Sequence, residues 1–267
     1  MRGWNWSPTA RVGMPIDKVR VLHGSTIYLE EGFGSFHSRS TVLGGSAVFE
    51  GAMALLQKIR TAAAERLGCA AEAIEVAEDR AGVQGGRSVT LAELAGPGLQ
   101  AEASFVNHHK HTYAYGTAAA HVAVDPGTGG VELIDYLVVE DVGRIVNPLT
   151  LHGQVIGATV QGLGGAFMED LVYDAKGQLL TGSLADYVIP TASDFPKIRA
   201  ISLEERPSPT NPLGVKGAGE GGIIPVGGLM ANAVAAALAS LGVEPRDMPL
   251  SPSRIWQLIA ASRNQLA

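Results

Sequence analysis

The sequence predicts an α+β protein, because segments with helical and with strand periodicity are mixed along the chain. The chain has 267 residues, of which 46% are hydrophobic, and this is enough to bury a core as one large domain or two small ones. Its 34 glycines fall in short clusters between apolar runs and form no low-complexity repeat. That distribution indicates close backbone packing or the approach of a ligand.

Two long helices frame the expected fold. The first covers residues 47–67, where apolar residues recur with helical spacing, and it ends near Gly68. The second covers residues 149–168 and begins at Asn147 and Pro148, which suit the N-cap and first positions of a helix.

Turn residues predict the strands that accompany these helices. The runs His121–Val124 and Val131–Val139 flank the turn Asp125–Gly129, which is a hairpin signal. Polar and turn residues cluster at 96–104, so we expect a boundary there between a first domain, residues 1–100, and a second, residues 101–267. The other expected elements are strands at Lys18–His23, Ile74–Ala77 and Ile198–Glu204, a capping box of Thr90 and Glu93, a hairpin of Leu171–Tyr173 with Gln178–Leu180, and a buried helix at Val226–Leu241.

Charge and cysteine content exclude several classes of protein. The net charge is −6 and no basic block occurs, so no nucleic-acid-binding surface is expected. Cys69 is the only cysteine, and one thiol makes neither an intrachain disulfide nor an iron–sulfur cluster. The first residues lack the apolar stretch of a signal peptide. The uncharged run 221–243 contains Pro225 and Asn232, which favours a buried helix over a membrane span. We therefore expect a cytoplasmic protein.

The most informative segment is the glycine-rich run 211–222, NPLGVKGAGEGG. Glycine-rich turns let backbone N–H groups approach an anion, and Lys216 adds a positive charge. Gly217 follows Lys216 where a Walker A loop needs Ser or Thr, so this is not that loop. Glu220 precedes an apolar helix, and a carboxylate in apolar surroundings binds a proton more tightly than in water and can serve as a base near neutral pH. The alternative is that Glu220 caps or salt-bridges the helix, with Lys216 as its surface partner.

A second candidate segment is the loop 32–40, GFGSFHSRS. Its backbone N–H groups and hydroxyls can donate to a phosphate, and Arg39 adds a bidentate guanidinium. The alternative is an ordinary flexible loop.

A third segment runs from residue 140 to residue 148, EDVGRIVNP, and into the following helix. Acidic residues end a strand there, and a helix N-terminus, which favours anions, follows. Gln154 and Gln161 are amides on an otherwise apolar helix, so a heterocyclic ligand edge is one partner for them. Hydrogen bonding between helices is the other.

The cluster His108–His111 invites a metal hypothesis. No carboxylate or cysteine is spaced to complete such a site, so a solvated loop is favoured and no metal ligands are assigned.

These segments together resemble one family, the molybdenum hydroxylases, which comprise the large subunits of xanthine dehydrogenase, aldehyde oxidase and aerobic carbon monoxide dehydrogenase. The matching blocks, in order, are GSFHSRSTV at 34–42, DVGRIVNP at 141–148 with GQVIG at 153–157, DYVIPTA at 186–192 and PSPTNPLGVKGAGE at 207–220. The resemblance covers about Arg11 to Leu258. It implies mixed sheets with packed helices, as in the C-terminal molybdenum-cofactor-binding domain of these enzymes.

The resemblance also implies a chemistry. Molybdenum is held by a pterin, commonly the cytosine dinucleotide form, and Glu220 is the base that takes the proton from the water-derived oxygen attacking the substrate carbon. The first domain would be one molybdopterin-binding subdomain, with the serine-arginine loop, and the second domain would be another, with the catalytic glutamate. The residues implied to bind the cofactor are Gly34, Ser35, Phe36, Ser38, Arg39, Ser40, Asp141, Val142, Arg144, Asn147, Gln154, Lys216 and Gly217.

The resemblance also implies partner subunits, which would supply the cofactors and segments that this sequence does not contain. Iron–sulfur clusters and FAD are expected on an iron–sulfur subunit and a flavin subunit. Family large subunits are much longer, and the upstream Gly-Gln-Gly segment and an earlier substrate loop are absent. Residues 1–10 also differ from the family. We expect a molybdopterin-binding catalytic subunit or, if the subunit is split, a half-subunit whose partner supplies the N-terminal half, acting on an aldehyde, an N-heterocycle or carbon monoxide. Two alternatives are a truncated, cofactor-free fragment that serves as an association or structural module, and a nucleotide-binding module built on the glycine-rich loops.

Overall fold

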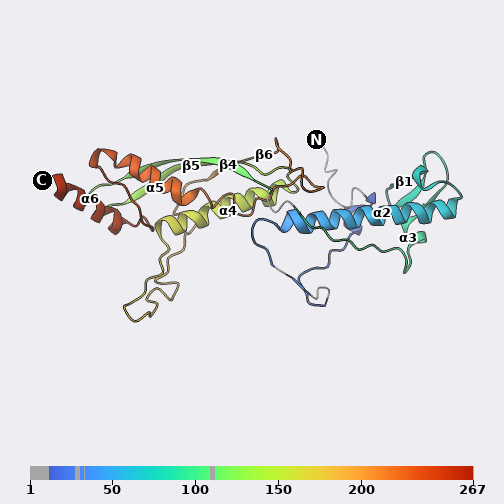
Figure 1. Ribbon diagram of the computed structural model, residues 1–267, viewed down its shortest axis with the longest axis horizontal. Helices are drawn as coiled ribbons and strands as arrows, with labels where there is room; N and C mark the ends of the chain where they lie inside the picture. The colour runs from blue at the N-terminus through green and yellow to red at the C-terminus, as the bar shows by residue number, and fades with distance from the viewer. Residues whose placement is uncertain (1–11, 28–30, 33, 109–111, 267) are drawn as a thin grey trace. The chain divides into compact units, whose positions relative to one another are not determined.

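The chain divides into two compact units. The computed structural model describes residues 12–27, 31–32, 34–108 and 112–266. Unit 1 comprises Met1–Thr112 with Pro207–Gly217, and unit 2 comprises Tyr113–Arg206 with Ala218–Ala267 (Figure 1). The division thus falls after the boundary expected near 96–104, and a later segment returns to the first unit.

Unit 1 is built on a long helix and a small sheet. Helix α2 (Ser46–Leu67) packs on an antiparallel sheet of β1 (Ile74–Ala77), β2 (Arg80–Val83) and β3 (Ser88–Thr90). The buried side chains between them include Ile59 and Ile74, which are 2% and 1% exposed. Burying each stabilises the unit by roughly 2 kcal/mol. The other elements of this unit are η1 (Ile16–Lys18), the π-helix η2 (Thr41–Gly45), η3 (Ala71–Ala73) and α3 (Leu91–Leu94).

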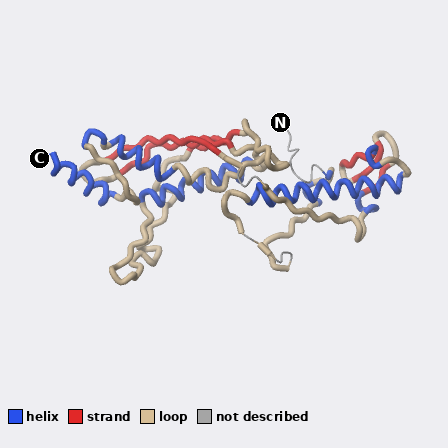
Figure 2. The backbone as a smooth tube through the Cα atoms, in the orientation of Figure 1, coloured by secondary structure: helices blue, strands red, loops and turns tan. Residues whose placement is uncertain are grey.

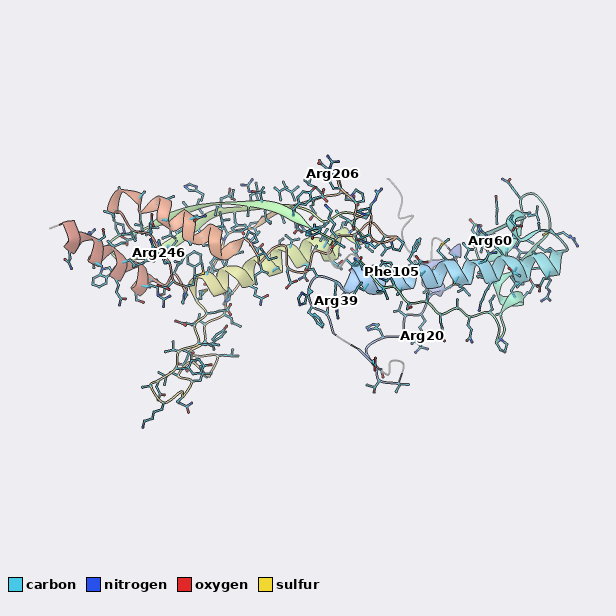
Figure 3. All side chains as sticks on the ribbon, viewed as in Figure 1. Arg20, Arg39, Arg60, Phe105, Arg206 and Arg246 are labelled. Carbon is cyan, nitrogen blue, oxygen red and sulfur yellow. The ribbon has the colours of Figure 1, made fainter. Side chains whose placement is uncertain are left out.

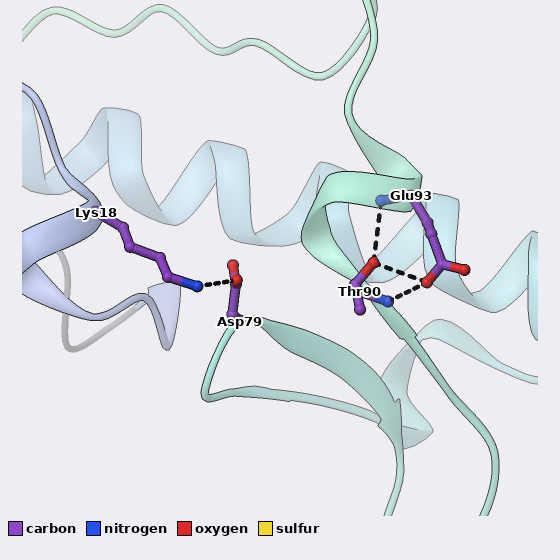
Figure 4. A network of polar contacts seen from close by, with 4 residues as sticks. All are labelled: Lys18, Asp79, Thr90 and Glu93. Atoms are coloured by element: carbon purple, nitrogen blue, oxygen red, sulfur yellow. Dashed lines mark hydrogen bonds and ion pairs between the residues drawn. The ribbon is translucent and has the colours of Figure 1, made fainter.

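Local capping signals in unit 1 are confirmed. Helix α2 ends at Gly68, whose φ of +67° lets its N–H donate to the Ala64 carbonyl over 2.8 Å. The capping box of α3 is present as expected (Figure 4). The Thr90 Oγ1 accepts from the Glu93 N–H over 3.2 Å, and the Glu93 Oε2 accepts from the Thr90 N–H over 2.7 Å.

The prediction of a strand at Lys18–His23 is wrong. Residues 16–18 form a single 3₁₀ turn, and the residues that follow join no strand. The Lys18 ammonium instead forms an ion pair with Asp79 (Figure 4). Short alternating runs form strands only where a partner strand is available.

Unit 2 is a mixed three-stranded sheet with helices on one face (Figures 1 and 2). Strand β5 (Val131–Asp141) pairs antiparallel with β4 (Tyr115–Val124) and parallel with β6 (Arg199–Leu203). This confirms the expected hairpin, which is longer than the sequence indicated. Helices α4 (Pro148–Phe167) and α5 (Val226–Ala237) bury a shared core against the sheet.

Unit 2 differs from the expectations at three other places. The second hairpin is reduced to one isolated bridge, Tyr173 with Leu179. Helix α5 ends at Ala237 and a 3₁₀ turn, η4 (Ala239–Leu241), follows. Helix α6 (Pro252–Leu266) was not expected. Within the described residues, no helix is both long and apolar enough to span a membrane.

Candidate functional site

The loop of residues 32–40 in unit 1, the serine-arginine loop, has a constrained backbone. Its residue Phe33 lies outside the described residues. His37 and Ser38 have φ values of +56° and +51°, which L-residues rarely adopt and which cost roughly 1–2 kcal/mol each. Strain of this kind is concentrated in ligand-binding segments.

Side chains within the loop hold one another. The Ser35 and Ser40 hydroxyls are hydrogen bonded at 2.7 Å, and the Arg39 guanidinium lies 4.1 Å from the centre of the Phe36 ring. Figure 3 shows Arg39 near the beginning of α2. The loop therefore presents hydroxyls and a guanidinium together.

A π-helix joins this loop to α2. Residues 41–45 form the wide turn, and the Leu43 N–H donates to the Arg39 carbonyl over 2.8 Å. π-Helical turns within helices are frequent at functional sites. The N–H groups at the start of a long helix add to the donors that can face an anion.

Gly217 brings the glycine-rich run to the serine-arginine loop within unit 1. Its φ is +85°, and a Cβ there would lie 2.1 Å from the Ser38 carbonyl oxygen. Lys216 is buried, and its carbonyl accepts from the Thr112 hydroxyl. The structure thus brings together Ser38, Lys216 and Gly217, three residues singled out from separate segments.

The 207–217 turn is fixed by one asparagine. The Asn211 Nδ2 donates to the Val215 carbonyl over 2.8 Å, and the Asn211 Oδ1 accepts from the Val215 N–H over 3.2 Å. Leu213 and Val215 are buried against Val42 of the π-helix. The side chains of Asn211, Leu213 and Val215 therefore fix the turn that leads to the backbone of Lys216.

In unit 2 the Asp141 carboxylate holds a turn. It is 3% exposed, and its Oδ1 and Oδ2 accept from the Gly143 and Arg206 N–H groups, each over 3.0 Å. Val142 is buried, and its N–H donates to the Leu203 carbonyl over 3.2 Å. Asp141 and Val142 thus shape the backbone that leads to α4.

The N-terminus of α4 is capped as expected. The Asn147 Oδ1 accepts from the Leu149 and Thr150 N–H groups over 3.0 and 3.3 Å. Pro148 takes the first helical position. Arg144 is exposed and precedes this cap.

Glu220 lies in a turn that two side chains of α4 hold. The Gln154 Nε2 donates to the Gly219 carbonyl over 2.7 Å, and the Thr159 hydroxyl donates to the Gly222 carbonyl over 3.2 Å. The Glu220 carbonyl accepts from the Ile223 N–H over 3.2 Å. Gln154 is exposed rather than buried, and it bonds the turn, which neither interpretation of this amide anticipated.

The environment of Glu220 differs from the expectation. Its side chain is exposed, whereas the sequence indicated apolar surroundings. Of the apolar residues that follow it, Ile224 is 77% exposed and Val226 is buried in the core of unit 2, so an apolar enclosure of the carboxylate is not formed by them.

Glu140 is a second buried carboxyl group, which belongs to the candidate segment 140–148 but to which the sequence assigned no role. It is 4% exposed at the end of β5, and burial raises its pKa to about 7. Its Oε1 is buried and has no hydrogen-bond partner within the part of the chain that the structure describes. The alternation of β5 was the available signal, because Glu140 falls on the same face as the buried Tyr136 and Val138.

A metal-ligand cluster is not found among the residues that the structure describes. Of the His108–His111 segment, His109, Lys110 and His111 lie outside those residues.

A family model described as a molybdopterin cofactor-binding domain matches residues 9–196. The chain belongs to this family. It is similar to the 6-hydroxypseudooxynicotine dehydrogenase complex subunit gamma of Paenarthrobacter nicotinovorans, with 36% identity over 90% of this chain and 32% of the relative. It is also similar to the carbon monoxide dehydrogenase large chain of Hydrogenophaga pseudoflava, with 31% identity over 92% of this chain and 32% of the relative.

Comparison with solved structures supports the same family. Quinoline 2-oxidoreductase from Pseudomonas putida 86 matches with a TM-score of 0.83 and 32% identity over 95% of this chain and 34% of that one. The expected family and the α+β fold with mixed sheets are therefore confirmed. The chain spans about a third of the length of the curated relatives that it matches.

Proposed function

We propose that this chain is the cofactor-holding, catalytic part of a molybdenum hydroxylase. The enzyme oxidises a carbon centre with oxygen derived from water. The relatives named above act, by their names, on a nicotine derivative, on carbon monoxide and on quinoline. We therefore propose an N-heterocycle or carbon monoxide as the substrate of the complete enzyme, and the family resemblance adds an aldehyde.

The serine-arginine loop is the proposed site for the dinucleotide part of the cofactor. Its observed donors fit phosphate oxygens, because the Ser35 and Ser40 hydroxyls and the Arg39 guanidinium precede the first turn of a long helix. Gly217 allows the glycine-rich run to approach this loop closely. We propose the cytosine dinucleotide form, with Gly34, Phe36 and Ser38 shaping the loop and Lys216 supporting it.

The second part of the proposed cofactor site belongs to unit 2. Asp141 and Val142 shape the turn before α4, while Arg144, Asn147 and Gln154 occupy that turn and the first turns of the helix. These residues are proposed to orient the pterin.

Glu220 is the proposed catalytic base. The cofactor, when bound, supplies the two-electron redox chemistry. The Glu220 carboxylate accepts the proton of the attacking water, and a base positioned in this way contributes about 10²–10⁴-fold to a rate. The observation that carries this role is the held turn, because Gln154 and Thr159 bond the carbonyls on either side of Glu220. A base held in place before reaction costs less to orient in the transition state.

Other chains complete the proposed enzyme. We propose that an N-terminal half of the molybdenum subunit, an iron–sulfur subunit and a flavin subunit assemble with this chain in the cytoplasm. The relatives' names, such as subunit gamma and large chain, support a multi-subunit complex.

The test is a pair of matched variants in the complex purified from its host. Turnover is measured with aldehydes, quinoline and carbon monoxide, using a dye as electron acceptor, and molybdenum and pterin are measured in the same samples. Glu220→Gln should lower turnover by about 10²–10⁴-fold while the cofactor is retained. Glu132→Gln, which removes another exposed carboxylate of unit 2, should leave both unchanged. A fully active Glu220→Gln enzyme would show that Glu220 is not the base.

A further inference from the structure

Glu140 occupies an unusual position for a carboxyl group. It is 4% exposed, and its Oε1 is buried without a partner among the described residues. Buried carboxyls are normally paired, because an unsatisfied one costs free energy. A buried polar group kept without a partner is a sign of a role that an apolar side chain would not fill.

Two glycines make room for this side chain. A Cβ on Gly221 would lie 2.0 Å from the Glu140 Oε2 and 3.2 Å from its Cδ. A Cβ on Gly116, which pairs with Glu140 on β4, would lie 2.9 Å from the Glu140 Cα. The carboxyl group therefore fills the space directly beneath the residue that follows Glu220.

The contact forms part of a close packing of the whole turn. A Cβ on Gly222 would lie 2.3 Å from the Val155 carbonyl oxygen, so the backbone at Gly222 packs directly against α4. Gln154 bonds the turn from the other end, at Gly219. Glu140 thus joins Gln154, Thr159 and the Val155 carbonyl in fixing the backbone on both sides of Glu220.

We propose that Glu140 is a positioning residue, whose buried side chain sets the place of the 219–222 turn and thereby the backbone of Glu220. The link to catalysis rests on the proposed role of Glu220 as the base. The effect of Glu140 on the position of the turn does not depend on that role. Since Glu140 acts through Gly221, its removal should loosen the turn without removing the cofactor.

The first experiment measures amide hydrogen exchange in the purified complex, over peptides that cover 219–224. Glu140→Ala should speed exchange there at least about tenfold, because the packing beneath Gly221 is lost. Glu140→Gln, which keeps the shape, should retain most of the protection. Val138→Ala is the matched control, since Val138 is 2% exposed on the same face of β5. It should weaken the core without a selective change at 219–224.

The second experiment measures turnover with the fastest substrate of the panel described above. Glu140→Ala should lower kcat about tenfold or more at unchanged KM and unchanged molybdenum content, and Glu140→Gln should restore most of the loss. Unchanged exchange over 219–224 in Glu140→Ala overturns the proposal. So does a loss in Glu140→Ala that Val138→Ala reproduces at the same peptides. An active Glu220→Gln enzyme together with faster exchange in Glu140→Ala would remove the catalytic role of Glu220 and leave the positioning role standing.

Discussion

The serine-arginine loop of unit 1 and the Glu220 turn of unit 2 are stabilised in opposite ways. The loop is largely exposed and holds itself, through the Ser35–Ser40 hydrogen bond and the contact of Arg39 with Phe36. The turn is held from outside, by Gln154, by Thr159 and by the buried Glu140. A loop of the first kind can adjust to a large ligand, whereas a turn of the second kind fixes a reacting group in advance.

The difference matches the two roles proposed for these regions. Binding a dinucleotide needs many moderate contacts, and the loop supplies hydroxyls, a guanidinium and the N–H groups that begin a helix. Proton transfer needs one carboxylate in one place. Substitutions that loosen the turn should therefore impair turnover, and substitutions that distort the loop should impair cofactor retention.

The largest expected effect concerns the ionisation of Glu140. Its pKa is raised from 4.5 to about 7 by burial alone, and the residues paired with it on β4 and β6, Gly116 and Ser202, do not ionise. Asp141 beside it in sequence directs its carboxylate to the Gly143 and Arg206 N–H groups. Below pH 4.5 the Glu140 carboxyl is protonated in both the folded and the unfolded chain, so it contributes no pH dependence.

Between pH 4.5 and 7 only the unfolded chain loses this proton, so the free energy of unfolding falls as pH rises, by roughly 3 kcal/mol in total. Glu140→Gln should abolish that part of the fall. Urea unfolding at pH 5 and pH 8 measures it, with Glu132→Gln as the exposed control. Identical pH dependence in Glu140→Gln and the parent chain would mean that the buried carboxyl does not titrate in this range.

The next effect tests the space beneath the turn. Gly221→Ala places a methyl group where the Glu140 Oε2 lies, so the turn or the carboxyl must move. A displacement of about 1 Å can cost up to about 100-fold in turnover. Gly228→Ala is the control, because its Cβ would meet open space on α5, and it should be neutral or slightly stabilising. Normal turnover in Gly221→Ala would contradict a fixed turn.

A smaller effect is expected in the loop. Gly217→Ala combines a φ of +85° with a contact of 2.1 Å to the Ser38 carbonyl oxygen, so it should lower the bound pterin about tenfold. Gly51→Ala, in the interior of α2, meets only an ordinary contact of 3.8 Å and should leave pterin content unchanged. Pterin is measured by fluorescence after its release. Full retention in Gly217→Ala would separate the glycine-rich run from cofactor binding.

Local signals in the sequence predicted local structure well. The Thr90–Glu93 capping box, the Asn147 cap and the left-handed stop at Gly68 each depend on residues within one turn, and all three are confirmed. The strand expected at Lys18–His23 depended on a partner strand that the fold does not supply. Strands are stabilised by their neighbours, so alternation by itself is weak support.

The sequence predicted residues of the candidate site but not the contacts between them. Glycine-rich and serine-arginine patterns selected Ser38 and Gly217, but their contact depends on the return of 207–217 to unit 1. The burial of Glu140 required the register of β5 together with the path of a turn 80 residues later in the chain. The exposure of Glu220 likewise depends on tertiary packing. Sequence periodicity carries no information on such long-range pairings.

The most direct test of the central proposal is metal and pterin analysis of the chain purified from its host with everything that co-purifies. We predict near-stoichiometric molybdenum with a pterin dinucleotide, together with chains that supply iron–sulfur clusters and the rest of the molybdenum subunit. A molybdenum-free chain without partners would contradict it and would favour a cofactor-free structural module.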